Sequence, residues 1–381
     1  MTNAKYPLGK NVFEAAKDRI RWVFNEFDNV IVNNSGGKDS TCVLNLALQV
    51  AEEEGRLPLK VMFLDQEAEW QATIDYQRKV FARAGVDPLW LQVPFKLFNA
   101  TSPTKQWLEC WEPGQEWVRE KEDISIKENV FGTDRFTDMF SAVQKHYYPN
   151  ESSAYLTGVR CEESPARRLG LTSYATYKHV TWGSVGNKKL NHYTFHPIYD
   201  WTYRDVWKSI HDNNWDYCKL YDYYYQYGIP VMKMRVSNVH HETAVRSLFF
   251  LHDIEPETWR NISTRLSGLN SACRLGDAFF CPKECPPMFK DWWEYRDHLL
   301  ENLILNEKHR EIMRRTFAGF DERYLPEAQL ALVHCEIKTI LTNDFEGAAL
   351  STFTAAHSKW SKNHGKNARR EEEKAALAAS S

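Results

Sequence analysis

Hydrophobic and polar positions in the first hundred residues follow two different spacings. From Val12 to Phe27 the apolar residues recur every three or four positions, which predicts an amphipathic helix that covers a sheet. Short apolar runs then alternate with helical stretches, and Gly55 and Gly85 stand where two of these helices should end. The predicted strands are 30–34, 60–65 and 89–95, and the predicted helices between them are 41–54 and 69–84. This alternation indicates an α/β fold with a parallel, doubly wound sheet.

The pattern changes twice further along the chain. Between residues 100 and 130 the periodicity is poor, which indicates either an insertion over a binding site or a substrate lid. A helix at 133–147, a strand at 154–159 and helices from Thr202 onward resume the α/β pattern. After about Val236 the spacing is mainly helical, with helices predicted at 241–252, 256–267, 291–315 and 326–341. We therefore expect an α/β domain over residues 1–236, a mainly helical domain over 237–345 and a charged tail over 346–381.

The charged tail allows two interpretations. Five Lys and Arg residues between positions 359 and 370 would suit contact with nucleic acid. A run rich in Glu follows them, and this balance of charge favours a solvated tail.

Length and charge restrict the classes of function. The chain has 381 residues and a formal net charge of -3, so its overall charge supports neither nucleic acid nor a membrane as a partner. No apolar run is long enough to cross a bilayer, and residues 1–10 lack the apolar core of a secretion signal, so we expect a cytoplasmic protein. Eight cysteines spread over this length indicate reduced thiols or metal ligands rather than a disulfide framework.

The most specific chemical signal is the segment 35–40, Ser-Gly-Gly-Lys-Asp-Ser, between a predicted strand and a predicted helix. Adjacent glycines let the backbone turn so that bare amide groups face an oxyanion, and the helix N-terminus adds partial positive charge. Lys38 supplies a full positive charge, and Ser35, Ser40 and Thr41 offer hydroxyls to phosphate oxygens. The segment therefore predicts a phosphate-binding loop whose ligand is a nucleotide.

This loop is not a Walker A motif, because Asp39 stands where the motif requires Ser or Thr after Gly37 and Lys38. It resembles the Ser-Gly-Gly-x-Asp-Ser loop of the adenine nucleotide alpha hydrolase superfamily. With Lys38 in the variable place, it resembles the phosphoadenosine phosphosulfate (PAPS) reductase family of that superfamily. The resemblance implies a Rossmann-like doubly wound parallel sheet that holds ATP or PAPS, followed here by a mainly helical C-terminal addition.

Three later segments occur in the order of that family. The second predicted strand ends in Asp65 and Glu67, where relatives carry an acidic residue beside the nucleotide. Residues 157–168 are similar to the family's Gly-x-Arg-x-x-Glu-Ser-x-x-Arg segment, and residues 196–207 to its Pro-Ile-x-x-Trp-x-x-x-Asp-Val-Trp segment. The resemblance covers about residues 10–235 and is weaker in the last third of the chain.

The resemblance implies roles for individual residues. The nucleotide-binding residues would be Ser35, Gly36, Gly37, Lys38, Asp39, Ser40, Thr41, Asp65 and Glu67. The residues that bind the transferred or acceptor anion would be Arg160, Arg167 and Arg168, because arginine forks suit sulfate and phosphate, with Glu162 or Glu163 holding a guanidinium in place. Asp39 and Asp65 would position Mg²⁺, and Lys38 would neutralise charge on a leaving pyrophosphate. The catalytic set is thus Lys38, Asp39, Asp65 and Arg160.

Two reactions are compatible with such a site. Many members of the superfamily cleave ATP between its α and β phosphates and adenylate a substrate, whereas PAPS reductases attack the sulfonate with a cysteine. The reductases carry a late Glu-Cys-Gly-Ile/Leu-His segment, but Cys335 here has no glycine after it and its histidine lies before it. We therefore expect an adenylating enzyme, with sulfur transfer as a candidate process; the sequence does not identify the acceptor. Sulfonucleotide reduction or sulfotransfer is the second hypothesis. A non-catalytic nucleotide sensor with a partner protein is the third, and nucleic acid is a conceivable acceptor.

Three cysteines form a separate candidate site. Cys273, Cys281 and Cys285 are separated by seven and three residues, and His240, His241 and Cys161 are available elsewhere. Thiolates of this number suit a zinc ion or an iron–sulfur cluster. Because the spacing matches no standard pattern, a structural loop that contains cysteines is favoured over a metal site.

Overall fold

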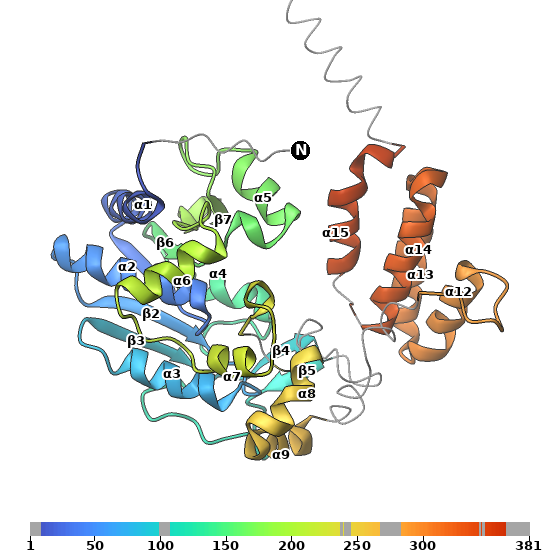
Figure 1. Ribbon diagram of the computed structural model, residues 1–381, viewed down its shortest axis with the longest axis horizontal. Coiled ribbons are helices and arrows are strands. Elements are labelled where there is room, and N and C mark those ends of the chain that lie inside the picture. The colour runs from blue at the N-terminus through green and yellow to red at the C-terminus, as the bar shows by residue number, and fades with distance from the viewer. Residues whose placement is uncertain are drawn as a thin grey trace, which may run out of the picture. The chain divides into compact units, whose positions relative to one another are not determined.

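A six-stranded sheet forms the centre of the N-terminal part of the chain, as the computed structural model shows (Figure 1). The structure describes residues 9–98, 107–236, 239, 245–266, 283–342, 344 and 347–362. The strand order is β3-β2-β1-β6-β8-β7, and all pairs are parallel except that the edge strand β7 runs antiparallel to β8. The strands are β1 Asn29–Asn33, β2 Leu59–Leu64, β3 Val86–Leu91, β6 Ser153–Leu156, β7 Gly183–Asn187 and β8 His192–Phe195.

The strand order reverses direction between β1 and β6. The chain first builds outward from β1 to β2 and β3, then crosses back to place β6 on the other side of β1. Ligands of open α/β sheets bind at such a switch point, beyond the carboxyl ends of the strands. The loops after β1 and β6 both end at this edge, so the topology brings residues 34–37 and 157–160 together.

Helices cover the two faces of the sheet. The helices are α1 Val12–Glu26, α2 Lys38–Glu53, α3 Gln71–Phe81, α4 Phe136–Tyr147 and α6 Tyr203–Asp212. Helices α1 and α6 pack beside α2, which also contacts β1 and β2. Parallel crossovers are right-handed, so the reversed crossover that carries α4 places this helix on the other face from α2 and α3. The hydroxyl of Tyr155 on β6 donates to the carbonyl of Phe140 on α4 at 3.0 Å.

Shorter elements complete this part of the chain. They are β4 Phe95–Phe98 and β5 Trp107–Cys110, which form a separate two-stranded sheet, and the helices α5 Pro165–Thr172, α7 Leu220–Gln226, α8 Val245–Ile254 and α9 Pro256–Arg265. Single 3₁₀ turns occupy Cys161–Glu163, Lys188–Leu190, Val231–Lys233 and Ser358–Trp360.

Gly158 allows the loop after β6 to touch the start of α2. A Cβ atom at this position would lie 2.6 Å from both the carbonyl carbon of Asp39 and the amide nitrogen of Ser40. Only glycine permits this approach of two backbones. The loop after β6 is therefore held directly against the phosphate-binding segment predicted from the sequence.

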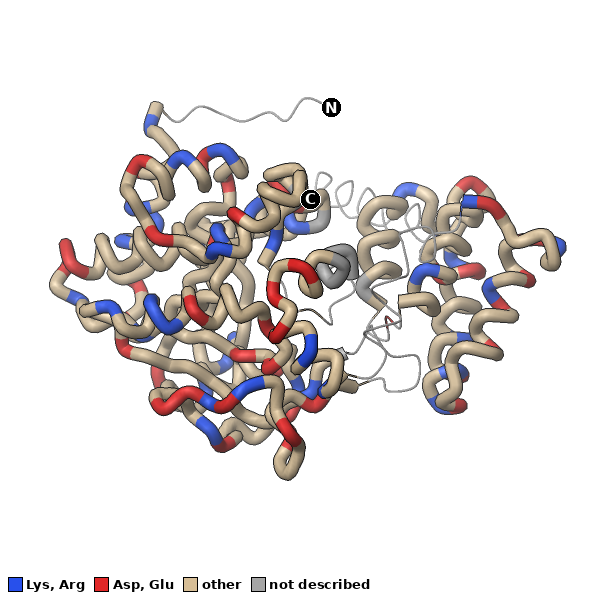
Figure 2. Tube along the Cα trace, turned by 60° about the horizontal axis from the view of Figure 1, so that its bottom comes forward, with Lys and Arg blue, Asp and Glu red and all other residues tan. Residues whose placement is uncertain are grey.

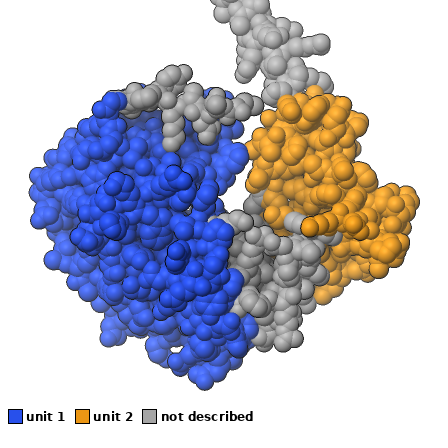
Figure 3. Space-filling model, in the orientation of Figure 1, with its two compact units in different colours: residues 1–97, 109–239, 250–265 blue, residues 98–108, 240–249, 266–381 orange. Residues whose placement is uncertain are grey.

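The chain divides into two compact units (Figure 3). The first comprises residues 1–97, 109–239 and 250–265, and the second comprises 98–108, 240–249 and 266–381. The described helices of the second unit are α12 Trp292–Leu303, α13 Glu307–Arg323, α14 Pro326–Leu341 and α15 Ala348–His357. Their apolar faces share one core, which includes Leu300, Phe317, Leu332, Ile337 and Phe353. The expected domain boundaries at 236 and 345 stay a prediction.

The predicted fold class is confirmed: a mostly parallel sheet is flanked by helices, and the C-terminal region is helical. The single helix predicted over 291–315 is wrong, because the chain leaves the helix after Leu303 and Asn306 caps a new one by accepting a hydrogen bond from the amide of His309. Edge strand β7 and helix α15 were not predicted.

Basic and acidic residues are interspersed along the described chain (Figure 2). None of its described helices has the length and apolar character to cross a membrane.

A buried ion-pair network ties three helices of the second unit together. Arg296 on α12 donates through Nη1 to Asp321 on α13 and to Glu336 on α14, both at 2.8 Å, and through Nε to Asp297 at 2.9 Å. The side chain of Glu336 is fully buried. Removal of the arginine would therefore leave a buried carboxyl group without its partner.

We expect Arg296→Met to lower the free energy of unfolding of α12 and α14 by about 3 kcal/mol, because breaking a buried pair costs more than replacing it. The double variant Arg296→Met/Glu336→Leu should recover much of this loss. Hydrogen exchange of the full chain, read in peptides from α12 and α14, measures both effects. Arg315→Met removes an exposed arginine from the same unit and serves as the control. Equal protection in Arg296→Met and Arg315→Met would contradict the expectation.

Candidate functional site

The loop after β1 presents backbone amides at the start of α2. Gly36 has φ +80°, and its amide donates to the side chain of Asn34 at 3.3 Å. A Cβ at Gly36 would lie 3.0 Å from Thr73, so both conformation and space favour glycine there. Gly37 occupies the N-cap position without a side-chain cap. Among the described residues, the amides of Gly37, Asp39 and Ser40 have no hydrogen-bond acceptor. Unpaired donors at a helix N-terminus are suited to bind an anion.

Tyr221 on α7 contacts both the backbone and the side chain of Lys38. Its hydroxyl accepts a hydrogen bond from the Lys38 amide at 2.8 Å, so this amide is not one of the unpaired donors. The Lys38 ammonium lies 5.6 Å from the centre of the Tyr221 ring, and burial, followed by the charge of Asp39, raises the pKa of the phenol. The neutral tyrosine thus holds both the backbone and the side chain of Lys38.

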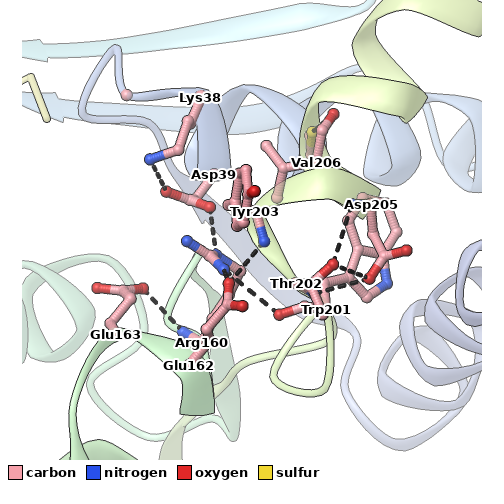
Figure 4. Close-up of polar contacts among 12 residues, drawn as sticks. Lys38, Asp39, Arg160, Glu162, Glu163, Trp201, Thr202, Tyr203, Asp205 and Val206 are labelled. Atoms are coloured by element: carbon pink, nitrogen blue, oxygen red, sulfur yellow. Dashed lines mark hydrogen bonds and ion pairs between the residues drawn. The ribbon is translucent and has the colours of Figure 1, made fainter. Parts of the chain in front are cut away.

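Asp39 lies between two cations (Figure 4). Its Oδ2 is 3.1 Å from the Lys38 Nζ, and its Oδ1 accepts from the Arg160 Nε at 2.5 Å. Lys38 and Arg160 are both nearly buried, whereas the side chain of Asp39 keeps 18% exposure. The ion pair with Arg160 joins the loop after β1 to the loop after β6.

In the segment after β6, glutamate side chains bind the arginines and orient them. Arg160 donates through Nη1 to Glu162 at 2.8 Å and to the Trp201 carbonyl at 3.3 Å, while Glu162 also accepts from the Tyr203 amide at 2.6 Å. Glu163 accepts from the Arg160 amide at 3.0 Å and forms an ion pair with Arg167. The structure thus places one glutamate against each of two arginines. Arg168 is half-buried on α5 and also has interaction partners.

Arg167 lies in a locally positive environment. Partial burial, and then repulsion from Arg235 and Arg160, lower its pKa. Beside it, His196 is buried, and its Nδ1 is 2.6 Å from the Thr157 hydroxyl. Burial, followed by the charge of Arg167, lowers the pKa of His196 to about 4, so this imidazole is neutral at pH 7. Positive charge that is incompletely balanced in a partly buried place favours an anion.

A cavity of about 240 Å³ opens beside the loop, at the ends of β1 and β2. Its apolar lining is Phe63, Leu64, Phe136, Phe140 and Val236. Its polar lining is Asn33, Ser35, Gln66 and Glu69. Ser35 belongs to both the cavity and the loop, because its hydroxyl is 3.2 Å from that of Ser40. The volume is below the roughly 300–1,000 Å³ of sites for drug-sized ligands and suits a nucleoside.

The first correction concerns Thr41, whose hydroxyl was predicted to bind a phosphate oxygen of the nucleotide. Its side chain is fully buried, and its hydroxyl is 2.9 Å from that of Tyr76 on α3. The hydroxyl therefore faces the helix layer and is not available to a phosphate. Ser40 keeps its place at the loop, where its hydroxyl donates to the Gly37 carbonyl at 2.9 Å.

The second correction concerns Asp65, which was predicted to bind the nucleotide and to position Mg²⁺. The residue is fully buried, and each carboxylate oxygen already accepts hydrogen bonds. Oδ1 accepts from the Glu67 amide at 3.0 Å, and Oδ2 accepts from Trp90 and Gln92 at 2.9 Å. Both oxygens also contact the Arg119 Nη2 at 2.5 Å. No lone pair is left for a metal or a nucleotide.

Glu67 is likewise a structural carboxylate rather than a nucleotide contact. It is 1% exposed with φ +62°, a conformation that non-glycine residues rarely adopt. It accepts hydrogen bonds from the Trp111 amide at 2.6 Å, the Val118 amide at 3.2 Å and Arg265 Nε at 2.9 Å. Asp65 and Glu67 thus anchor the segment after β5 and the end of α9 to the sheet. This segment was expected to be an insertion over the site or a lid.

The predicted cysteine site lies mostly outside the described residues. Cys273, Cys281, His240 and His241 all fall in parts of the chain that the structure does not describe. Cys285 is described and half-buried. Within the described ranges, no three or more His, Cys, Asp or Glu side chains gather as they would around a metal ion.

Four contributors to the site were not found from the sequence. They are Glu69, His196, Tyr221 and Arg235, which reach the site from separate elements. Tyr221 lies in a run of tyrosines typical of core packing, and His196 precedes a proline typical of a turn. Glu69 carried the best available signal, because it follows the acidic residues at the end of the second strand.

Comparisons with known proteins agree on the N-terminal part of the chain. The "Phosphoadenosine phosphosulfate reductase domain" family matches residues 29–227, and the "Domain of unknown function (DUF3440)" family matches residues 228–345. "Uncharacterized protein YbdN" of Escherichia coli (strain K12) is 29% identical, and the match covers 94% of each chain. "Sulfate adenylyltransferase subunit 2" of Aliivibrio fischeri (strain MJ11) is 23% identical over 53% of this chain and 63% of that protein. "Adenosine 5'-phosphosulfate reductase" of Anoxybacillus flavithermus (strain DSM 21510 / WK1) is 22% identical over 57% of this chain and 77% of that protein.

The first family match begins at β1 and ends just after α7, so it includes the loop at 35–40, the segment after β6 and the strands of the sheet. It spans more than half of the 381 residues. The chain therefore belongs to the phosphoadenosine phosphosulfate reductase domain family.

Proposed function

We propose that this protein binds an adenine nucleotide at the switch point of the sheet and transfers the adenylyl group of ATP to an oxyanion acceptor. The observation that carries the proposal is the meeting of unpaired amides, Lys38 and a nucleoside-sized cavity at one loop. The names of two relatives are consistent with a nucleotide-binding enzyme, since one is a sulfate adenylyltransferase subunit and another is an adenosine 5'-phosphosulfate reductase.

The phosphates would bind at the start of α2. The amides of Gly37, Asp39 and Ser40 have no acceptor among the described residues, and phosphate oxygens would supply one. Lys38 adds the positive charge that a polyphosphate requires. The nucleoside would occupy the adjoining cavity, whose phenylalanines provide apolar contact for a base and whose Ser35 links it to the loop.

The acceptor would bind on the other side of Asp39. Arg160, Arg167 and Arg235 supply positive charge there, and Thr157 with neutral His196 supplies hydrogen bonds. An acceptor oxygen would form a bond to the α-phosphorus while the bond from that phosphorus to the bridging oxygen breaks. Pyrophosphate then leaves, and Lys38 stabilises its developing charge. Arginines that are already oriented reduce the repulsion between the anionic acceptor and the phosphates of ATP when the two are brought together.

Magnesium fits this site only in part. Asp65 has no free lone pair, so the predicted pair of carboxylate ligands does not exist. Asp39 keeps solvent exposure and is the carboxylate that remains available at the loop.

Sulfonucleotide reduction is a second candidate, favoured by one observation: the half-buried thiol of Cys161 directly follows Arg160. The other thiols described in the first unit fit a nucleophile poorly. Burial is the main cause that raises the pKa of Cys42, Cys110 and Cys218, in the last case to about 12. A thiol of this kind is protonated and weakly nucleophilic at pH 7.

Lys38→Met should weaken ATP binding by about 10- to 100-fold, since a hydrogen bond to a charged group contributes about 1.5–3 kcal/mol. Isothermal titration of the full chain measures this. Lys79→Met removes an exposed lysine from α3 and should leave the affinity unchanged. If both variants bind ATP as tightly as the wild type, the phosphates do not lie at this loop.

Turnover should release one pyrophosphate per adenylyl group transferred, and we expect it only when an oxyanion acceptor such as sulfate or phosphate is present. Arg167→Met should raise the acceptor concentration at half-maximal rate about tenfold while leaving ATP affinity unchanged, because it removes one charge from the acceptor side. Arg315→Met is the control. Tight ATP binding without pyrophosphate from any acceptor would instead favour the nucleotide-sensing hypothesis.

Sulfonucleotide reduction makes a different prediction. Incubation with PAPS that carries a labelled sulfonate should leave the label on a cysteine, and Cys161→Ser should abolish it. We expect no such adduct, because the adenylating reaction needs no thiol. Mass spectrometry of tryptic peptides identifies the labelled residue, and an adduct on Cys161 would replace the leading proposal with this one.

A further inference from the structure

Residues 164–199 form the longest stretch of the sequence without Asp or Glu, although the chain has 51 of these among its 381 residues. The stretch contains five cations, namely Arg167, Arg168, Lys178, Lys188 and Lys189. Its formal charge is therefore +5 with neutral histidines, whereas the whole chain has a formal charge of -3. An anionic partner that the overall charge disfavours would find a local match here.

The structure places this acid-free stretch along the edge strand of the sheet, β7 (Figure 1). Gly183 of β7 pairs with Phe195 at the end of β8, and Asn187 pairs with His192 at its start. Strand β7 therefore runs from the end of the sheet that holds the candidate site to the opposite end. At about 3.3 Å per residue its length is about 16 Å, which spans several phosphates of a nucleic-acid strand.

Cations stand at both ends of β7. Arg167 on α5 acts through its charge on His196, which directly follows β8. At the other end, Lys188 and Lys189 follow β7 in a single 3₁₀ turn. Both lysines are exposed, and within the described ranges neither forms an ion pair.

The other cations of the stretch are only lightly neutralised. Arg167 forms an ion pair with Glu163, and Lys178 forms one with Glu26 at 2.5 Å, so both acids come from outside the stretch. The side chains of Arg167 and Lys178 keep 45% and 53% exposure. Positive charge therefore remains accessible to solvent between the two ends of β7.

The loop between α5 and β7 is fixed to the core. The ring centre of Tyr177 lies 5.2 Å from that of Phe27 and 4.7 Å from that of Tyr193. The hydroxyl of Thr176 donates to the Gly183 carbonyl at 2.9 Å. The exposed side chains of this loop are thus carried by a backbone that is already ordered, which lowers the entropic cost of binding.

The same loop exposes an aromatic ring. Tyr174 is 84% exposed, and Leu169 on α5 is 58% exposed. Proteins that bind single strands combine cations that follow the phosphates with aromatic rings on which bases stack. An acidic peptide would use the charge of this surface but not the ring, so the combination favours nucleic acid.

We propose that residues 164–199 form a docking surface for a single strand of nucleic acid. Its backbone follows β7 between the pair Lys188 and Lys189 and Arg167, and one of its bases stacks on Tyr174. The inference goes beyond the proposed function and does not depend on it, because docking requires no ATP.

Fluorescence anisotropy of a labelled single-stranded oligonucleotide of about 12 nucleotides, titrated with the full chain at several salt concentrations, tests the inference. The double variant Lys188→Gln/Lys189→Gln should bind at least tenfold more weakly at low salt. Its slope of log affinity against log salt should be smaller by about 1.4, since each lost phosphate contact removes about 0.7. The double variant Lys79→Gln/Lys208→Gln removes two exposed lysines from α3 and α6 and should bind like the wild type.

Tyr174→Ala should lower the affinity at least fivefold, because it removes the stacking ring, whereas Tyr174→Phe should bind like the wild type. The absence of binding by the wild type, or equal losses in the two lysine double variants, would overturn the inference. Displacement of the strand by an oligoglutamate of equal charge as readily as by unlabelled strand would assign the surface to an acidic protein instead. ATP affinity of Lys188→Gln/Lys189→Gln should equal that of the wild type, so a failure of docking is distinct from a failure of the proposed function.

Discussion

The ion pair between Asp39 and Arg160 is the contact on which the arrangement of the site depends. It joins the first residues of α2 to the loop after β6, and these belong to the two oppositely directed halves of the sheet. Gly158 allows the two backbones to approach each other. Glu162 and the Trp201 carbonyl accept hydrogen bonds from the guanidinium of Arg160 and orient it. The pair is nearly buried, so its geometry is strongly determined. The cavity adjoins the loop after β1 through Ser35, and Arg167 follows the loop after β6.

The buried acids at the end of β2 have unequal roles. The carboxylates of Asp65 and Glu67 are occupied by hydrogen bonds to neighbouring segments, whereas Glu69, two residues further, lines the cavity. The three acids lie in one tight turn, in which Glu67 has a left-handed conformation and the amide of Glu69 donates to the Glu67 carbonyl at 2.9 Å. One short acidic stretch thus supplies both the support of the site and a group able to meet a ligand.

The sequence was sufficient for those parts of the site that depend on local structure. The strand, glycine loop and helix at 29–53 could be predicted because each feature follows from neighbouring residues, and Arg160 with its glutamates lies within one short motif. Asp65 and Glu67 were misassigned because their partners, Arg119 and Arg265, are 54 and 198 residues away. Thr41 was misassigned for the same reason, since Tyr76 belongs to another helix. Non-local pairing decides whether a polar group faces a ligand or the core, and local residue patterns do not reveal it.

The ion pair between Glu67 and Arg265 has a consequence for where the chain divides into folded units. Arg265 ends α9, which lies inside the stretch matched by the second sequence family, yet this helix belongs to the same compact unit as the sheet. The border between the two families at 227 and 228 therefore does not coincide with a border in three dimensions. The carboxylate of Glu67, which lies in the stretch matched by the first family, is paired by a guanidinium from the stretch matched by the second. The folded unit around the sheet is therefore completed by residues from both stretches.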